Sequence, residues 1–263
     1  MVRERHADCR LSVAIITKNE EERLPACLEG LEFADEVVVV DSESTDRTLD
    51  VARSRGANVF VQPWMGFSGQ KQYAVDRCRN RWVLVLDADE RVPPETALKI
   101  PEELETADPS FSAFSFKRKN LLHGKWIKHC GWWPDRVVRL VDRTRGKFDG
   151  RAVHEGWATQ GQIRHLDACI EHVSFRDYSQ LLEKMERYSS LAAGEMYGKG
   201  IRANGLEPVT HGIWMFIRTY LLELGLLEGF DGFMISATNA GGSFLKYAKL
   251  REKWEHGKAP LRR

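Results

Sequence analysis

The first hundred residues alternate between two hydrophobic periodicities. Runs of consecutive apolar residues, typical of strands buried on both faces, are separated by segments in which apolar residues recur every three or four positions, as in amphipathic helices. This alternation predicts an α/β fold in which helices cover both faces of a mostly parallel sheet. The predicted strands are 11–16, 36–40, 58–62 and 82–86, and the predicted helices lie within 19–31, 44–56 and 69–79.

Residues at the ends of two predicted helices agree with this assignment. Asn19 and Glu22 have the spacing of a side-chain cap, so the first helix is expected to begin beside them. Gly56 follows the second helical segment, at the position where a residue in the left-handed conformation commonly ends a helix.

The periodicity changes after residue 110. Shorter segments of mixed polarity predict strands that are partly exposed and that pair in a mixed or antiparallel way. These segments are 111–118, 137–143 and 157–166.

A helical pattern returns after Phe175 and continues toward the end of the chain. The segment 211–237 is strongly apolar, although four charged residues interrupt it. In the preceding helix, 178–197, the residues expected to share one apolar face are Leu181, Met185, Tyr188 and Ala192.

Composition narrows the class of protein. Of the 263 residues, 43% are hydrophobic and 29% are charged, which predicts a packed core. The formal net charge of +1 excludes a strongly basic body that coats nucleic acid, so no nucleic-acid partner is expected. The five cysteines form no CxxC pair, which indicates a reducing compartment and argues against a zinc cage.

The N-terminal segment predicts where the protein resides. The chain is polar and charged up to Leu11, and the apolar run that follows is too short for the core of a secretory signal. No stretch of 18 apolar residues is present, so a spanning helix is not expected. These features favour the cytoplasm.

Acidic and polar motifs follow three of the predicted strands. They are "TKNE" (17–20), "DSESTD" (41–46) and "DADE" (87–90). In open α/β sheets ligands bind outside the carboxyl ends of the strands. Carboxylates there suit hydroxyls, a nucleobase N–H or a divalent cation, whereas a bare phosphate requires glycines and a helix N-terminus. Neither GxxxxGK[ST] nor GxGxxG occurs, which argues against a P-loop.

Asp87 and Asp89 stand one residue apart at the tip of a buried strand. Such a strand would hold two acids rigidly, and Mg²⁺ or Mn²⁺ could then join a carboxylate to the oxygens of a diphosphate. The alternative is that both acids solvate a turn.

The order of the motifs is more specific than any one of them. The segments "AIITKNEEERL", "VVVVDSESTDRT" and "VLVLDADERV" together resemble the nucleotide-sugar-binding half of inverting glycosyltransferases of family 2, which have the GT-A fold. The resemblance implies a Rossmann-like sheet with a C-terminal helical extension. It also implies a UDP-sugar donor bound by Thr17, Asn19, Glu20 and Asp41, with Asp87 near the ribose or the metal and Asp89 as the direct metal ligand.

Lys71 has two interpretations at this stage. A lysine on a helix that faces the strand tips could contact a donor phosphate, or its side chain could lie on a solvated helix face.

Later motifs resemble one branch of the family. They are "WWPDRVVRLVDR", "VHEGW", "HVSFRDYSQLLEKMERYS" and "GFDGF". They are similar to segments of the enzymes that add β-linked glucose from UDP-glucose to a heptose of the lipopolysaccharide inner core at the cytoplasmic face of the inner membrane. The expected organisation is a catalytic domain 1–175, with a nucleotide-sugar half at about 10–95 and an acceptor half at about 96–175, and a helical region 176–263.

An inverting transfer needs a base that takes the proton of the acceptor hydroxyl. The family places an acid after the DxD motif, which implies Glu155, with Asp135 as the reserve candidate. The alternative for Glu155 is a surface acid paired with Arg151 or His154.

Three further side chains are expected to bind the metal or the diphosphate. His172 is favoured over His154 as another metal ligand or diphosphate contact, although an isolated histidine is commonly structural. Arg136 and Arg139 could stabilise the leaving diphosphate, or form ion pairs with Asp135 or Asp142.

A lipid-linked acceptor would require contact with the inner membrane. The segment 211–237 could lie in the bilayer interface, with basic residues of the tail near anionic headgroups. The alternative is that this segment packs on the catalytic domain or on a second copy, and the oligomeric state stays open. The basic tail residues are Lys246, Lys249, Arg251, Lys253, Lys258, Arg262 and Arg263.

Three other classes of protein remain as alternatives. A phosphatase of the haloacid dehalogenase type carries its DxD at the first strand, whereas here the motif follows the fourth predicted strand. A nucleotidyltransferase has a glycine-rich loop after the first strand, where this chain has "TKNEEE". A non-catalytic nucleotide-sugar-binding protein would keep the donor site without turnover. An enzyme of the same family with another surface-polysaccharide or lipid-carrier acceptor is the nearest alternative.

Overall fold

A computed structural model describes residues 9–150 and 156–256 of the chain and divides it into two units. The first unit comprises Met1–Lys119 and Asp135–His172, and the second comprises Asn120–Pro134 and Val173–Arg263. The segment Asn120–Pro134 therefore groups with the C-terminal helices rather than with the sheet that precedes it in the chain. The expected division into 1–175 and 176–263 stays a prediction.

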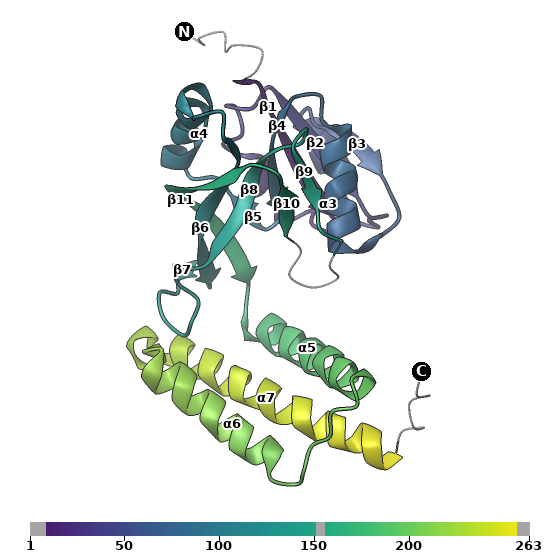
Figure 1. Ribbon diagram of the computed structural model, residues 1–263, viewed down its shortest axis with the longest axis vertical. Helices are drawn as coiled ribbons and strands as arrows, with labels where there is room; N and C mark the ends of the chain where they lie inside the picture. The colour runs from purple at the N-terminus through teal and green to yellow at the C-terminus, as the bar shows by residue number, and fades with distance from the viewer. Residues whose placement is uncertain (1–8, 151–155, 257–263) are drawn as a thin grey trace. The chain divides into compact units, whose positions relative to one another are not determined.

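Four parallel strands form one half of the sheet in the first unit (Figure 1). Their spatial order is β3-β2-β1-β4, and each adjacent pair is parallel. The prediction of a parallel sheet from the apolar runs is confirmed. The strands are β1 (Leu11–Thr17), β2 (Glu36–Asp41), β3 (Asn58–Val61) and β4 (Trp82–Asp87).

The sheet continues beyond β4 in the order β8-β6-β11-β5, and the pairs of β4 with β8, β8 with β6 and β11 with β5 are antiparallel. A two-residue strand, β7 (Lys125–Trp126), pairs with β6 in the second unit. The segment 157–166, expected as one strand, instead contributes to two sheets, because β10 (Trp157–Thr159) pairs with β9 (Gly146–Phe148) and only the residues after it enter the main sheet. The other strands are β5 (Glu90–Arg91), β6 (Phe111–Leu122), β8 (Arg136–Asp142) and β11 (Gln162–Phe175).

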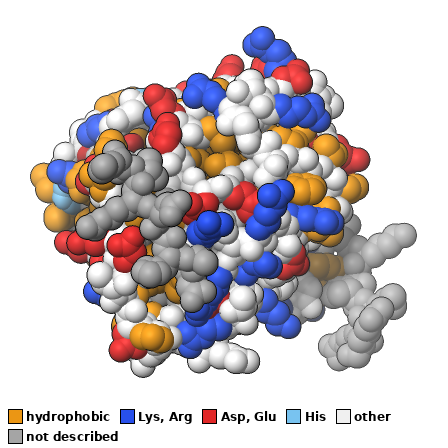
Figure 2. Space-filling view, turned by 90° about the horizontal axis from the view of Figure 1, so that it is seen from above, with side chains coloured by type: hydrophobic (Ala, Val, Ile, Leu, Met, Phe, Trp, Pro, Cys, Tyr) orange, Lys and Arg blue, Asp and Glu red, His pale blue; other side chains and the backbone are white. Residues whose placement is uncertain are grey.

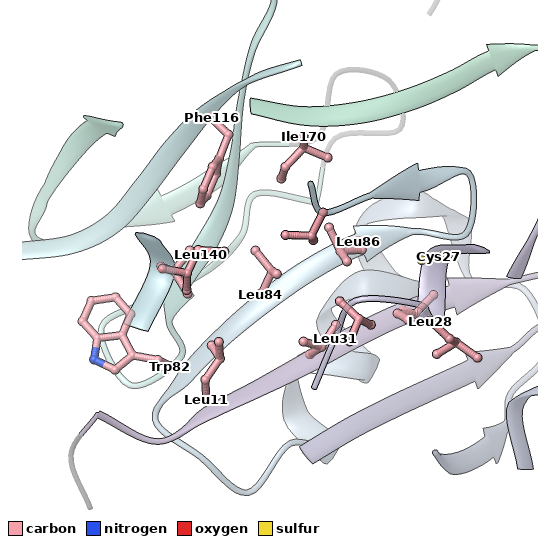
Figure 3. Close-up of a cluster of buried hydrophobic side chains, with 14 of the residues drawn as sticks. Leu11, Cys27, Leu28, Leu31, Trp82, Leu84, Leu86, Phe116, Leu140 and Ile170 are labelled. Carbon is pink, nitrogen blue, oxygen red and sulfur yellow. The ribbon is translucent and has the colours of Figure 1, made fainter. Parts of the chain in front are cut away.

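Both faces of β1, β2 and β4 are largely buried, which explains why these strands are apolar at nearly every position, whereas the edge strand β3 is partly exposed. Successive side chains point to opposite faces, so Leu11, Leu84 and Leu86 join one core (Figure 3), and Ile16 and Val85 join the other. Helices α1 (Leu24–Leu28), α2 (Thr48–Ser54) and α4 (Pro94–Thr106) contribute to the first core, and α3 (Gly66–Arg77) contributes to the second. Helix α4 was not predicted from the sequence.

The predicted cap of the first helix is wrong. Helix α1 begins at Leu24 after Arg23, and no side chain caps it. Asn19 instead adopts a left-handed conformation (φ 54°), and its Oδ1 accepts the backbone N–H of Thr45 at 2.8 Å. The Asn19 side chain therefore hydrogen-bonds to the turn after β2 and does not cap helix α1. Asparagine side chains bind backbone groups in turns as readily as at the ends of helices.

Charged side chains of both signs are interspersed on the face of the molecule shown in Figure 2. This distribution agrees with the formal net charge of +1.

The second unit is built on three helices, of which α7 packs against both α5 and α6 (Figure 1). The helices are α5 (Tyr178–Gly198), α6 (Glu207–Ile217) and α7 (Phe230–His256). No helix within residues 9–150 and 156–256 combines the length and the apolar character that crossing a bilayer requires. Of the predicted basic tail, Lys258, Arg262 and Arg263 lie outside the described residues.

The buried stripe of α5 differs from the predicted one. Leu181 is buried as expected, but Tyr188 is exposed, and Ser189 and Ala193 are buried instead. These buried residues are eight and four positions apart, with the partly buried Met185 between the first two, so the helix packs on one i, i+4 row and the larger tyrosine turns outward.

The segment 211–237 folds as a helical hairpin rather than as one helix. Between α6 and α7 lie a π-helical turn, η2 (Arg218–Leu222), and a 3₁₀ turn, η3 (Gly225–Glu228). The motif "GFDGF" explains the reversal, because Gly229 has a φ of 67° and a Cβ at Gly232 would overlap the carbonyl oxygen of Gly225.

Candidate functional site

The predicted motifs meet at the carboxyl edge of the parallel strands because the strands are in register. Thr17 pairs with Asp41 across β1 and β2, and Ile16 pairs with Asp87 across β1 and β4. The last residues of the three strands therefore lie at one level of the sheet. This is the position at which open α/β sheets bind their ligands.

The first two motifs form one hydrogen-bonded turn. Thr17 Oγ1 donates to Asp41 Oδ2 at 2.9 Å, and the backbone N–H of Ser44 donates to Asp41 Oδ1 at 2.8 Å. Asp41 is fully buried, so its carboxylate organises the turn in this structure. The backbone N–H of Glu20 donates to Thr48 Oγ1, which ties the loop after β1 to the start of α2. Donor contacts by Thr17, Asn19, Glu20 and Asp41 stay predictions.

Asp89 lies beside His172. The short strand β5 follows directly after Asp89 and pairs with β11, where His172 stands opposite Glu90. This pairing brings His172 Nε2 to 3.4 Å from Asp89 Oδ2. Burial alone would raise the pKa of Asp89, but the hydrogen bond and charge of His172, together with Arg23, outweigh it and lower that pKa. The carboxylate therefore remains ionised, as a metal ligand must.

Asp87 has two cationic partners. Lys71 Nζ lies 2.9 Å from Oδ1, and Arg139 donates to Oδ2 at 2.7 Å. Although burial would raise the pKa of Asp87, the charges of Lys71 and Arg139 hold it well below its usual range. The alternative of a solvated helix face for Lys71 is wrong, since only 2% of its side chain is exposed. The two acids of the DxD motif thus have different environments.

Glu90 is a buried member of the site to which sequence analysis gave no role. Its side chain has no exposed surface; Oε1 accepts from Arg139 at 2.6 Å, and Oε2 accepts the backbone N–H of Asp87 at 3.1 Å. Arg118 lies 3.7 Å from the same Oε1. Glu90 is the last residue of the motif "DADE", so the sequence did contain a hint of its place in the site. No motif near Arg118 indicated that this arginine lies beside Glu90.

The remaining candidates occupy different environments. Asp135 Oδ2 accepts from Arg118 at 2.7–2.8 Å, and Arg136 is exposed and donates to the carbonyl of Leu166 at 3.2 Å. Arg139 pairs with Asp87 and Glu90, two acids that the sequence had not suggested for it. The predicted base Glu155 and the histidine His154 lie outside the described residues.

Asp89 and His172 are the residues of the site best arranged to hold a cation. A carboxylate oxygen and an imidazole nitrogen that converge are ligands of Mn²⁺ and, through the oxygen, of Mg²⁺. Within the described part of the chain no group of three or more histidine, cysteine, aspartate or glutamate residues could hold a metal ion. A cation bound between Asp89 and His172 would therefore need further ligands beyond the described side chains, such as oxygens of a substrate or water.

Replacing Arg139 with methionine is expected to destabilise the fold by about 3 kcal/mol, because the change leaves the buried Glu90 and the partly buried Asp87 without their shared cation. Only 8% of the Arg139 side chain is exposed, and its partner Glu90 has no exposed surface. Urea unfolding would measure the loss. The double variant Arg139→Met/Glu90→Gln should recover part of it, since one of the two acids is then neutral.

The matched control for this prediction is Arg53→Met, which removes an arginine from the exposed pair with Asp50. Exposed pairs contribute about 0–1 kcal/mol, so little change is expected there. An equal effect of both substitutions would contradict a structural role for the Arg139 network.

Comparisons with known proteins find a family model and several relatives that match most of the chain. Residues 12–164 match the family model described as Glycosyl transferase family 2. An uncharacterized glycosyltransferase of Rickettsia typhi is 32% identical over 258 residues, which cover 92% of this chain and 87% of the relative. The lipopolysaccharide core biosynthesis glycosyltransferase LpsC of Rhizobium meliloti is 31% identical over 256 residues, 92% of each chain. Among solved structures, S. aureus TarS in complex with UDP is 14% identical, over 95% of this chain and 92% of that one, with a TM-score of 0.44.

Proposed function

Because the chain belongs to glycosyltransferase family 2, we propose that it transfers a hexose from a UDP-sugar to a heptose of the lipopolysaccharide inner core. The proposed hexose is glucose, and the transfer inverts the configuration at the anomeric carbon. The main observation behind the proposal is the pairing of Asp89 with His172 at the carboxyl edge of the sheet. Asp87, which pairs with Lys71 and Arg139, lies beside them. The relative named for lipopolysaccharide core biosynthesis, matched over 92% of each chain, supports the acceptor class.

Asp89 and His172 are proposed to hold Mg²⁺ or Mn²⁺ together with oxygens of the donor diphosphate. When bound, such an ion neutralises negative charge that develops on the departing diphosphate. Asp89 contributes because it is ionised, and His172 contributes through Nε2, which faces the carboxylate. The arrangement of β5 on β11 fixes both side chains before the donor arrives.

Asp87 is proposed to contact the donor ribose, held in place by Lys71, Arg139 and the Glu90 behind it. Two cations keep this carboxylate ionised, so it accepts hydrogen bonds from hydroxyls. Lys71 and Arg139 also place fixed positive charge at the edge where the diphosphate would lie.

Glu155 is proposed as the base that removes the proton of the acceptor hydroxyl as that oxygen attacks the anomeric carbon. Asp135 is the reserve candidate, although its engagement by Arg118 makes it less accessible to a substrate proton. The acceptor is borne by a membrane, so the proposal places the protein on the cytoplasmic face of the inner membrane, in peripheral contact with it.

The test is release of UDP from a panel of UDP-sugars, with and without Mn²⁺ or Mg²⁺, with deep-rough lipopolysaccharide as acceptor. Metal-dependent release from UDP-glucose only when the heptose-bearing acceptor is present is the expected result. Donor binding without release on that acceptor would exclude the heptose acceptor and leave another surface polysaccharide, a lipid carrier or a non-catalytic binding role. Absence of binding to any UDP-sugar would overturn the donor site.

A further inference from the structure

Exposed leucine and phenylalanine side chains surround the turn between α6 and α7. Leu222, Leu227 and Phe230 are each more than half exposed. Single exposed apolar residues are ordinary, but a group of them marks an interaction site. We call this group the hairpin tip, and its members are Leu221, Leu222, Leu224, Leu226, Leu227 and Phe230.

The loop 123–129, which includes the short strand β7, carries Lys125 and Lys128 and no acid. Within the second unit this loop contacts Glu228, which lies between Leu227 and Phe230 of the hairpin tip. Lys125 Nζ donates to the carbonyl oxygen of Glu228 and lies 2.9 Å from its Oε2. Glu228 Oε1 accepts the backbone N–H of Lys128 at 2.8 Å and lies 2.7 Å from His129 Nδ1. The apolar tip and the basic loop therefore form one surface.

The ion pairs of this surface turn their cations outward. The side chain of Lys125 is 47% exposed and that of its partner Glu228 is 5% exposed. In the second pair the side chain of Arg218 is 54% exposed and that of its partner Glu223 is 24% exposed. The acids are thus the inner members of these pairs, and the outer charge of the surface is positive.

Lys128 adds an outer cation beside a tryptophan. Lys128 is exposed, and its Nζ lies 4.7 Å from the ring centroid of Trp126. Trp126 in turn packs edge-on against Trp133. Amphipathic tryptophan next to lysine is the combination that suits the headgroup level of a bilayer.

We propose that the hairpin tip and the loop 123–129 dock on a bilayer that carries anionic headgroups, with the leucine and phenylalanine side chains entering the interface and Lys125 and Lys128 meeting the lipid charge. A second copy of the chain fits less well, because a two-fold interface would bring this surface against itself and place its outer cations against one another. The proposal rests on the proposed function only for the reason to dock, a membrane-borne acceptor.

The experiment is co-sedimentation of the full chain with vesicles of phosphatidylcholine alone or mixed with phosphatidylglycerol, without donor sugar. Binding is expected on the anionic vesicles. The triple variant Leu222→Ser/Leu227→Ser/Phe230→Ser should bind them about 10-fold or more weakly, since apolar area drives interfacial insertion. Lys128→Glu should lose about 10-fold on anionic vesicles only, and added salt should reduce the difference.

The matched control is Leu98→Ser, which changes a highly exposed leucine of α4 in the first unit and should leave vesicle binding unchanged. Wild-type protein that stays in the supernatant, or a triple variant that sediments like the wild type, would overturn the proposal. A dimer by light scattering that the triple variant converts to monomer, without vesicle binding, would assign the surface to a second copy instead. Vesicle binding in a protein that releases no UDP from any donor would overturn the proposed function but not this surface.

Discussion

Replacing Asp89 with alanine is expected to lower the rate of sugar transfer on the order of 10³-fold, the scale seen when one stabilising group for developing negative charge is removed. The reason lies in the pairing with His172: the two side chains face each other at 3.4 Å, and the Asp89 carboxylate is ionised. Without the carboxylate, His172 alone cannot hold a divalent ion beside the donor.

The measurement has two parts, because activity alone does not separate metal binding from folding. Steady-state UDP release gives the rate, and calorimetric titration of UDP with and without Mn²⁺ gives donor affinity. The metal-dependent part of the UDP affinity should disappear in Asp89→Ala, while urea unfolding shows a folded protein. His172→Ala should weaken the same metal-dependent affinity in part.

Asp50→Ala is the control for this variant, because Asp50 is an exposed acid of α2 outside the strand-edge site. Its side chain pairs with Arg53 of the same helix. It should transfer sugar at the wild-type rate. Metal-dependent UDP affinity that survives in Asp89→Ala would show that this carboxylate is not the metal ligand.

Replacing Glu155 with glutamine is expected to lower turnover by about 10²–10⁴-fold, the usual contribution of a general base, while donor binding stays intact. Glutamine has nearly the same size as glutamate but cannot accept the proton of the acceptor hydroxyl at neutral pH. The expected signature is therefore a fall in kcat with little change in the affinity for UDP-sugar. Single-turnover release of UDP in the presence of acceptor measures the chemical step directly.

Asp135→Asn serves as the comparison, since Asp135 is the reserve candidate and already accepts from Arg118. Near wild-type turnover of Glu155→Gln, together with a large loss in Asp135→Asn, would reverse the assignment of the base. Loss of UDP-sugar binding in Glu155→Gln would place the residue in the donor site instead.

The parallel half of the fold followed from the sequence because its signal is local. Strands β1, β2 and β4 are largely buried on both faces, so their residues are apolar at nearly every position, and the helices between the strands carry their own period. The positions of Thr17, Asp41, Asp87 and Asp89 at one edge followed too, since the carboxyl ends of parallel strands in register must meet there.

The sequence was less informative where short or unusual elements depend on distant partners. Helix α4 was missed, and Asn19 was assigned to a helix cap although the turn after β2 engages its side chain. Propensity allowed both uses of Asn19, and only the position of the neighbouring strand selected one of them.

The sequence by itself determined the family, the parallel sheet and the acids at its edge, because apolar periodicity and motif order are properties of neighbouring residues. Only the tertiary structure decided that His172 faces Asp89, through the pairing of β5 with β11, and that Lys71 and Arg139 are the cations paired with Asp87. Those partners come from strands and helices far apart along the chain. Strand register and side-chain direction, rather than spacing in the sequence, set which charges meet in a buried site.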